Sequence, residues 1–463
     1  MKLFGTAGIR GFTNKEITPE FAMKVGLSFG TYLRQNSRVA VARDTRFGAD
    51  CITNGFLSGL AATGVTIEYG SIFPTPGVAS YVCETKADAG AVITGSHIPP
   101  DMVGIILLNG DGSDVGGENA RKIEKILEKN SFRLVNYNEI KPVTTVDMTK
   151  IYFADLLRNV SLREFWNRRF RILFDPVNGA LCNLIDPLFS RLGINLVKVN
   201  EEHSGIPNRK SEPRRDILIE TAKKVVENNC DLGIATDIDG DRVLFITDKG
   251  KVVSEDVMGA LFAEYELRIT DNETERPAIV TPINSSEVIR EVCKKHNAKL
   301  IYTKIGPPEI SNAIRNNQAI FAYEETGKYF FAREKNFACS LKSTIKLLEI
   351  MLRENKTLEE LVTNYPEYPQ KKVAIHLDRT TKINLDECLT KFQMMLDEKF
   401  ELVTLDGYKL IFTDGSWVLI RASGTEPLLR IFAEGKTVER VNKLIEMAVK
   451  AVESNQSLGL KAQ

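Results

Sequence analysis

Hydrophobic and polar positions follow one order three times along the chain: an apolar strand, a turn, a helix and a second apolar strand. The first strands are expected at Val39–Ala42, Arg171–Phe174 and Ala278–Thr281. The second strands are expected at Thr66–Tyr69, Asn195–Val199 and Lys299–Tyr302, after helices that end near Leu192 and His296 in the last two stretches. Strands that alternate with helices are typical of α/β domains with largely parallel sheets. The pattern therefore predicts a tandem repeat of one architecture.

The chain after about residue 370 follows a different pattern of short apolar runs and tight turns. Strands are expected at Lys372–Leu377, Leu402–Leu405, Tyr408–Phe412, Ser416–Ile420 and Leu429–Ala433, with hairpin turns at Asp406-Gly407 and Asp414-Gly415. A final helix would place one apolar face over Val438, Val441, Ile445, Ala448 and Val452. This part predicts a small α+β domain with a mostly antiparallel sheet.

Composition excludes several classes of protein. The 463 residues carry 61 basic and 61 acidic side chains, and this balance argues against a broad nucleic-acid or anionic-lipid surface. No apolar run approaches the ~20 residues of a membrane span, and the N-terminus lacks the apolar segment of a signal peptide. The seven cysteines are scattered and odd in number, which favours reduced thiols over a disulfide scaffold or a zinc site. We expect a cytoplasmic protein.

An acidic loop is the sharpest chemical feature. Asp237, Asp239 and Asp241 follow an apolar strand at every second position, so an extended backbone would point all three carboxylates to one side. Their repulsion favours a bound cation, and oxygen ligands favour Mg²⁺ or Ca²⁺. Arg242 stands where an EF-hand needs glycine. The alternative is a solvated acidic turn.

Three further loops carry polar residues after apolar strands. The turn at 94–99 would leave the Ser96 hydroxyl and the His97 ring exposed, although a plain polar turn gives the same pattern. The stretch 421–430 has an arginine at each end and a Ser-Gly-Thr turn, which suits a phosphate monoester or, alternatively, a solvated hairpin. The stretch 323–328 has adjacent carboxylates that suit sugar hydroxyls but is also typical of a charged loop.

In this order, the loops resemble those of the α-D-phosphohexomutase superfamily. Phe4–Gly11 is similar to its F-G-T-x-G-I-R-G, Thr94–Pro99 to its T-A-S-H-N-P phosphoserine loop, and Asp237–Arg242 to its D-G-D-G-D-R metal loop. Tyr323–Lys328 is similar to its G-E-x-S-G-H sugar loop, and Arg421–Pro427 to its R-x-S-G-T-E-P phosphate loop. The resemblance implies three α/β domains with mixed, mostly parallel sheets and a C-terminal α+β domain around a central cleft. We expect these domains at 1–140, 141–250, 251–368 and 369–463.

The resemblance implies a reversible exchange of phosphate between the 1- and 6-positions of a hexose (glucose, mannose or glucosamine) through a 1,6-bisphosphate. Catalysis is assigned to Ser96 as the phosphoryl carrier, His97 and Arg10, and Mg²⁺ binding to Ser96, Asp237, Asp239 and Asp241. Substrate binding is assigned to Arg242, Lys304, Glu324, Thr326, Lys328, Arg421, Ser423, Gly424, Thr425 and Arg430. The expected partner is a small hexose phosphate, with a homodimer as an open possibility.

Several positions depart from the family pattern. Gly95 and Ile98 replace its Ala and Asn, Tyr323, Thr326 and Lys328 replace its Gly, Ser and His, and Ile106 stands where a lysine is usual. Because that lysine is a candidate proton shuttle, His97 with a pKa near 6.5 is the favoured replacement, and Lys328 and Lys304 are its rivals. A non-catalytic sugar-phosphate-binding protein and a phosphatase are the alternative functions.

Overall fold

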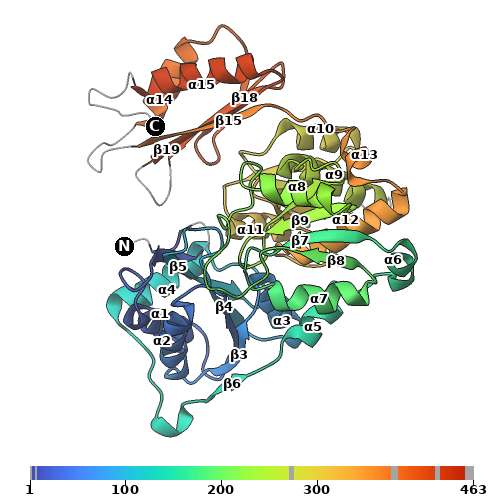
Figure 1. Ribbon diagram of the computed structural model, residues 1–463. Helices are drawn as coiled ribbons and strands as arrows, with labels where there is room; N and C mark the ends of the chain where they lie inside the picture. Colours follow the sequence, from blue (N-terminus) through green and yellow to red (C-terminus); the bar gives the residue numbers. More distant parts are fainter. Residues whose placement is uncertain (1–2, 6–7, 271–275, 377–383, 423–427, 454–463) are drawn as a thin grey trace.

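The computed structural model describes residues 3–5, 8–270, 276–376, 384–422 and 428–453, and the chain forms four sheets covered by helices (Figure 1). We call each sheet with its helices a domain and number the domains 1 to 4 in chain order. Among the described residues, no helix has both the length and the apolar character that a membrane span requires.

Domain 1 contains a mixed six-stranded sheet in the order β1-β5-β4-β2-β3-β6. Its strands are β1 (Ile9–Phe12), β2 (Arg38–Arg43), β3 (Thr66–Ile72), β4 (Ala89–Ile93), β5 (Met102–Asn109) and β6 (Val143–Thr145). Its helices are α1 (Pro19–Tyr32), α2 (Ala49–Ala61), α3 (Thr75–Thr85) and α4 (Gly117–Lys129), with a 3₁₀ turn at Tyr137–Glu139. The α1 helix begins where the Thr18 hydroxyl caps the Phe21 amide and Pro19 fixes the first turn.

Domains 2 and 3 each contain a four-stranded sheet with the same kind of pairing. Domain 2 has α5 (Thr149–Leu156), α6 (Leu162–Arg168), β7 (Arg171–Asp175), α7 (Cys182–Arg191), β8 (Asn195–Lys198), α8 (Ile219–Glu227), β9 (Leu232–Thr236) and β10 (Val243–Thr247). Domain 3 has α9 (Glu255–Ile269), β11 (Ala278–Pro282), α10 (Glu287–Lys295), β12 (Lys299–Thr303), α11 (Pro307–Asn317), β13 (Phe321–Glu324), β14 (Lys328–Phe330), α12 (Ser340–Glu354) and α13 (Leu358–Val362).

The predicted repeat is confirmed. In each of the three domains, a central strand (β2, β7 or β11) pairs in parallel with the strand after the next helix (β3, β8 or β12). On its other side it pairs in parallel with β4, β9 or β13, and an antiparallel strand (β5, β10 or β14) follows that one. The connection between these last two strands therefore occupies the same place in all three sheets.

Domain 4 contains the predicted antiparallel sheet, in the order β15-β19-β18-β17-β16. Its elements are β15 (Gln370–His376), α14 (Leu385–Met394), β16 (Phe400–Val403), β17 (Tyr408–Phe412), β18 (Trp417–Ala422), β19 (Leu428–Glu434) and α15 (Val438–Glu453). The final helix buries Val441, Ile445, Ala448 and Val452 as expected. Val438 is an exception, because it begins the helix and is 57% exposed.

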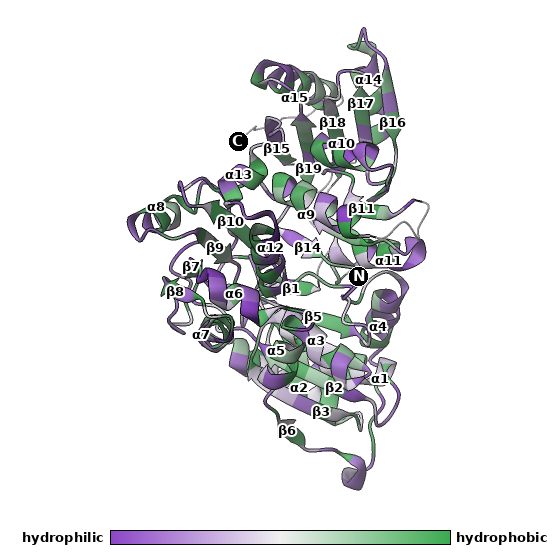
Figure 2. Ribbon diagram, turned by 90° about the vertical axis from the view of Figure 1, so that its right-hand side faces the viewer, coloured by the Kyte–Doolittle hydropathy of each residue, from purple (hydrophilic) through white to green (hydrophobic). Residues whose placement is uncertain are grey.

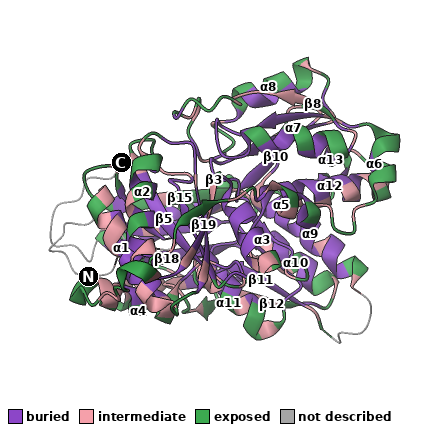
Figure 3. Ribbon diagram, turned by 90° about the horizontal axis from the view of Figure 1, so that it is seen from below, coloured by how far each residue is buried: buried purple, intermediate pink, exposed green. Residues whose placement is uncertain are grey.

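The hydrophobic cores divide the molecule into two parts. One large apolar cluster includes residues of domains 1, 2 and 3, whereas domain 4 has a core of its own. Figure 2 shows several strands in the colour of apolar residues, and α4, which has many charged residues, buries only Ala120 and Ile123. Buried residues fill the interior between the sheets, and exposed ones lie on outer helices such as α6 and α8 (Figure 3). Domain 4 is thus the part least tied to the common core.

Glu264 of α9 bonds to Tyr365, which lies in the segment between α13 and β15 that leads into domain 4. Burial alone would raise the pKa of this carboxyl, but hydrogen bonds from Lys295, Tyr365 and His296 outweigh burial and lower the pKa to about 2. Since the folded pKa lies below the ordinary value of 4.5, the stabilisation is complete above pH 4.5 and is lost as the pH falls through about 2.

We expect Glu264→Gln to lower the free energy of unfolding at pH 7 by about 1–2 kcal/mol. Urea unfolding between pH 7 and pH 3 would show the gap to the unsubstituted protein narrowing at acid pH. Glu220→Gln, on the exposed surface of α8, is the control and should change little. A gap that does not depend on pH would contradict this role of the charge.

Candidate active site

The Ser96 loop joins β4 to β5 in domain 1. Ser96 adopts a left-handed conformation with φ of 47°, uncommon for a residue other than glycine, so the turn constrains its backbone. Its Oγ donates to Oδ2 of Asp237 in domain 2 at 2.9 Å and lies 3.3 Å from Nδ1 of His97. The expectation of an exposed hydroxyl is wrong, because Ser96 is only 2% exposed beneath the domain 2 loop.

Arg46 and Asp44 hold this loop in place. The buried Arg46 guanidinium donates to the backbone carbonyls of Ser96 and Ile98 at 2.7 Å, and to those of residues 99 and 102 at 2.5 and 3.0 Å. The Asp44 carboxylate accepts from the Gly95 amide and the Thr94 hydroxyl, both at 2.9 Å. Four carbonyls on one guanidinium fix the turn that presents the serine.

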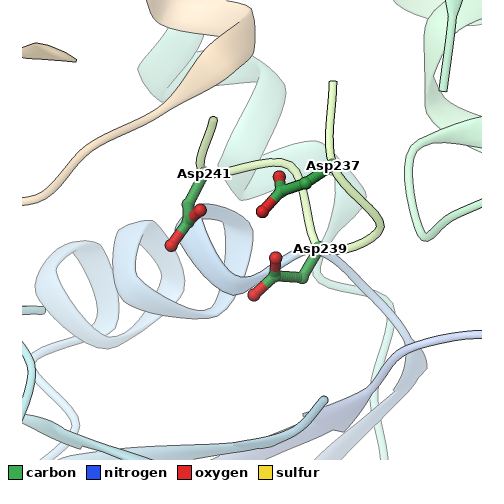
Figure 4. Close-up of side chains that lie close together, drawn as sticks. All are labelled: Asp237, Asp239 and Asp241. Carbon is green, nitrogen blue, oxygen red and sulfur yellow. The ribbon is translucent and has the colours of Figure 1, made fainter. Parts of the chain in front are cut away.

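The three aspartates come together as expected, but for a different reason. Residues 237–242 form a turn rather than an extended segment, and Gly240 occupies the left-handed region with φ of 74°. One Asp237 oxygen accepts from the amides of Gly240 and Arg242, each at 3.1 Å, which closes the turn. The turn points Asp237, Asp239 and Asp241 toward one another (Figure 4), with oxygens within 4.8 Å.

The donor set of this cluster fits a hard divalent cation. Thr75 donates to one Asp239 oxygen at 2.6 Å and Lys328 to one Asp241 oxygen at 2.6 Å. The second oxygen of each of these two carboxylates is buried without a hydrogen-bond partner among the described residues. Burial and the neighbouring carboxylates raise the pKa of Asp237 and Asp239, which shows how unfavourable their charge is without a cation. Oxygen-only ligands suit Mg²⁺.

His97 lies between two arginines, and its pKa is far from the expected value. Its Nε2 is 3.4 Å from guanidinium nitrogens of both Arg10 and Arg242. Burial, Arg242 and Arg10 lower the pKa of His97 far below 6.5, so the ring is neutral at physiological pH. Because guanidinium groups only donate, Nε2 accepts and Nδ1 carries the proton that faces Ser96 Oγ. The expectation that His97 titrates near pH 6.5 is therefore wrong.

The loop between β13 and β14 of domain 3 lies beside the aspartates of domain 2, where Lys328 contacts Asp241. Glu324 and Lys328 face each other across the two strands, and Thr326 donates to Glu324 at 3.2 Å. Lys328 is 4% exposed, and although burial would lower its pKa, Asp241 raises the pKa, so the ammonium remains charged. Glu325 turns away and bonds to Asn284 and Lys372.

The remaining predicted residues belong to the sequence ranges of domains 3 and 4. Lys304 is exposed, and within the described part of the chain no hydrogen bond or ion pair joins its side chain to the Ser96 loop or the aspartates. Arg421 and Arg430 are directly opposed on β18 and β19 of domain 4. Opposed like charges are unfavourable in a sheet, and the Asp406 carboxylate, 3.3 Å from Nη2 of Arg421, offsets part of this repulsion. Ser423, Gly424 and Thr425 lie outside the described residues.

Arg46, Asp44 and Thr75 were not predicted as site residues. Arg46 and Asp44 follow the central strand β2, and Thr75 begins α3 beside Asp239. The available signal was the charged Arg43–Arg46 run at the carboxyl end of an apolar strand, where α/β sheets bind ligands. A solvated loop gives the same sequence pattern, so the signal is weak.

Comparison with family models gives four matches in chain order. The models describe the phosphoglucomutase/phosphomannomutase α/β/α domains I, II and III and the C-terminal domain. They match residues 1–134, 150–250, 254–368 and 376–451.

Known relatives cover nearly the whole chain. A phosphoglucomutase/phosphomannomutase of Thermococcus kodakarensis is 34% identical over 98% of both chains, and a phosphopentomutase of the same organism is also 34% identical over 98% of both. A phosphoglucosamine/phosphogalactosamine mutase of Sulfurisphaera tokodaii is 32% identical over 98% of this chain and 99% of its own. The solved structure of a phosphoglucomutase/phosphomannomutase family protein of Burkholderia thailandensis shares the fold, with a TM-score of 0.86 and 22% identity over 100% and 99% of the two chains.

The aspartate cluster predicts direct metal binding. Asp239→Asn should weaken Mg²⁺ binding by roughly tenfold or more, because one of three anionic ligands becomes neutral. Isothermal titration calorimetry with MgCl₂ measures this without reference to activity. Asp216→Asn, at an exposed side chain of the same domain, is the control. Equal affinities of the two variants would rule out Asp239 as a ligand.

The family pattern has alanine at position 95, and we expect that Gly95→Ala lowers the stability of this chain. An added Cβ would lie 2.2 Å from Cζ of Arg46, so Gly95→Ala must displace the guanidinium that holds the loop. We expect a loss of about 1–3 kcal/mol of stability, measured by urea unfolding. In an Arg46→Ala background the same change should cost much less, and equal costs in both backgrounds would show that no such clash exists.

Proposed function

Because the chain belongs to the phosphoglucomutase/phosphomannomutase family, we propose that it moves a phosphoryl group reversibly between the 1- and 6-positions of a hexose phosphate. The observation that carries the proposal is the contact between Ser96 and the buried aspartates, with Arg10, Arg242 and Lys328 around them. Phosphoryl transfer depends mainly on positioning and charge neutralisation, and these groups supply both.

Ser96 is proposed as the phosphoryl carrier. Its Oγ accepts a hydrogen bond from the Nδ1–H of His97 and donates one to Asp237, so the oxygen is oriented on both sides. Arg46 keeps the loop from moving while phosphate is gained and lost. A bound Mg²⁺, held by Asp237, Asp239, Asp241 and Ser96, would neutralise phosphoryl oxygens.

The cations around Ser96 have distinct proposed roles. Arg10 and Arg242 converge on His97, so their guanidinium groups flank the serine and stabilise the charge of the transferring group. Arg242 is oriented by Glu212 at 2.6 Å. His97, neutral and with its Nε2 lone pair engaged, is suited to orient Ser96 rather than to shuttle protons.

Lys328 offers a replacement for the cation that the family pattern places at position 106. Ile106 pairs with Val92 in the sheet and is buried in the apolar core, so it brings no charge to the site. Lys328 approaches from domain 3 and shares a small cavity with Thr75, Asp114 and Asp241. We assign Lys328 the neutralisation of substrate oxygens near the metal loop.

The substrate's sugar and its second phosphate would be held by domains 3 and 4. Glu324 and Thr326 offer oxygens to sugar hydroxyls, and Arg421 and Arg430 flank the predicted phosphate loop. The relatives named above act on glucose, mannose, glucosamine, galactosamine and pentose phosphates by their descriptions. The proposal therefore commits to a sugar monophosphate, with hexose phosphates first.

The alternative is a protein that binds sugar phosphates without turnover, as the loss of the lysine at position 106 suggested. A phosphatase is the third possibility. The intact Ser96, the three aspartates and the gathered cations favour transfer over both.

Intact mass spectrometry distinguishes the three. We expect a species about 80 Da heavier, one phosphoryl group, which is lost on incubation with excess sugar monophosphate and restored by glucose 1,6-bisphosphate. Ser96→Ala should lack it and lose nearly all interconversion of the 1- and 6-phosphates of glucose, mannose, glucosamine and ribose (1- and 5- for ribose), whereas Ser58→Ala on the surface of α2 should retain both. Release of inorganic phosphate without isomerisation would indicate a phosphatase, and substantial activity of Ser96→Ala would overturn the assignment.

A further inference from the structure

Asp406 occupies the turn between β16 and β17 of domain 4, where one carboxylate oxygen has two partners. This Oδ2 accepts from the backbone amide of Ile305, in the β12–α11 loop of domain 3, at 3.2 Å. The same oxygen lies 3.3 Å from Nη2 of Arg421. Oδ2 of Asp406 therefore contacts both the backbone of domain 3 and Arg421, the arginine that flanks the predicted phosphate loop.

Within the described part of the chain, the Arg421 guanidinium contacts Asp406 through Nη2. Arg421 is 7% exposed, and its Nε has no hydrogen-bond partner among the described residues. Asp406 therefore orients the guanidinium through Nη2. Arg430, directly opposite, adds positive charge that Asp406 partly balances.

The contact at Ile305 lies in the interface between domains 3 and 4. Ile283 of domain 3 packs with Trp417 and Phe432 of domain 4 in a small apolar cluster. Nearby, Glu434 accepts from the Glu287 amide of α10 at 2.7 Å. These contacts join the domains at the Trp417–Glu434 end of β18 and β19. Asp406 contacts Arg421 toward the other end of β18.

We propose that Asp406 is a positioning residue that couples the capture of substrate phosphate by Arg421 to the docking of domain 4 on domain 3. The inference rests on the proposed function only for the identity of the phosphate. When domain 4 is docked, the Ile305 amide fixes the carboxylate, and the carboxylate fixes the orientation of the Arg421 guanidinium. Phosphate that binds this oriented arginine favours the docked arrangement in return, since linkage is reciprocal.

Two substitutions separate the halves of this coupling. Asp406→Asn keeps an oxygen for the Ile305 amide but removes the charge that faces Arg421. Asp406→Ala removes both. We expect each variant to raise the KM for glucose 1-phosphate, and the inhibition constant of inorganic phosphate, by about tenfold with little change in kcat. Hydrogen exchange of the Ile305 amide should accelerate in Asp406→Ala and remain slow in Asp406→Asn.

Asp414→Asn is the matched control, because Asp414 occupies the other hairpin turn of the same sheet and also lies 3.3 Å from an arginine, Arg440. It should change neither KM nor exchange at Ile305. Unchanged KM and phosphate inhibition in Asp406→Asn would overturn the proposal, as would slow Ile305 exchange in Asp406→Ala. If the unsubstituted protein turns over no sugar phosphate, the proposed function fails, while binding of inorganic phosphate and Ile305 exchange still test the coupling.

Discussion

Burial of three carboxylates at one point is the constraint on which the site depends. Asp237 and Asp239 are 0% exposed and Asp241 is 8% exposed, and their mutual repulsion opposes folding of the loop. The surrounding structure offsets part of this cost through Lys328 and the Thr75 hydroxyl. These partners come from domains 3 and 1, so the charge of one loop holds three domains together.

The repeated architecture explains why the loops meet. Each of the first three domains places its chemical loop between the parallel strand beside the central strand (β4, β9 or β13) and the antiparallel strand that follows it. Side chains at this edge of each sheet therefore face a common centre once the three domains share one core. Domain 4 differs in topology and has a separate core, so its arginines depend on interface contacts for their position.

Contacts in the structure explain the departures from the family pattern at positions 95, 106 and 328. Ile106 extends the apolar core, and Lys328 brings a cation to the aspartates from another domain. Gly95 leaves room for the Arg46 guanidinium, which has no space beside a larger residue. Burial and the two flanking arginines, Arg242 and Arg10, lower the pKa of His97 and keep the ring neutral.

The sequence by itself determined the local features: the strand–helix order, the antiparallel C-terminal sheet, the acidic loop and the family. Periodicity and turn residues act over a few positions and leave direct traces in the chain. The tertiary structure alone decided that Ser96 is buried, that a turn at Gly240 gathers the carboxylates and that Arg46 clamps the serine loop. It also decided the charge state of His97, because burial and the field of distant residues set a pKa, and neither has a signature in neighbouring sequence positions.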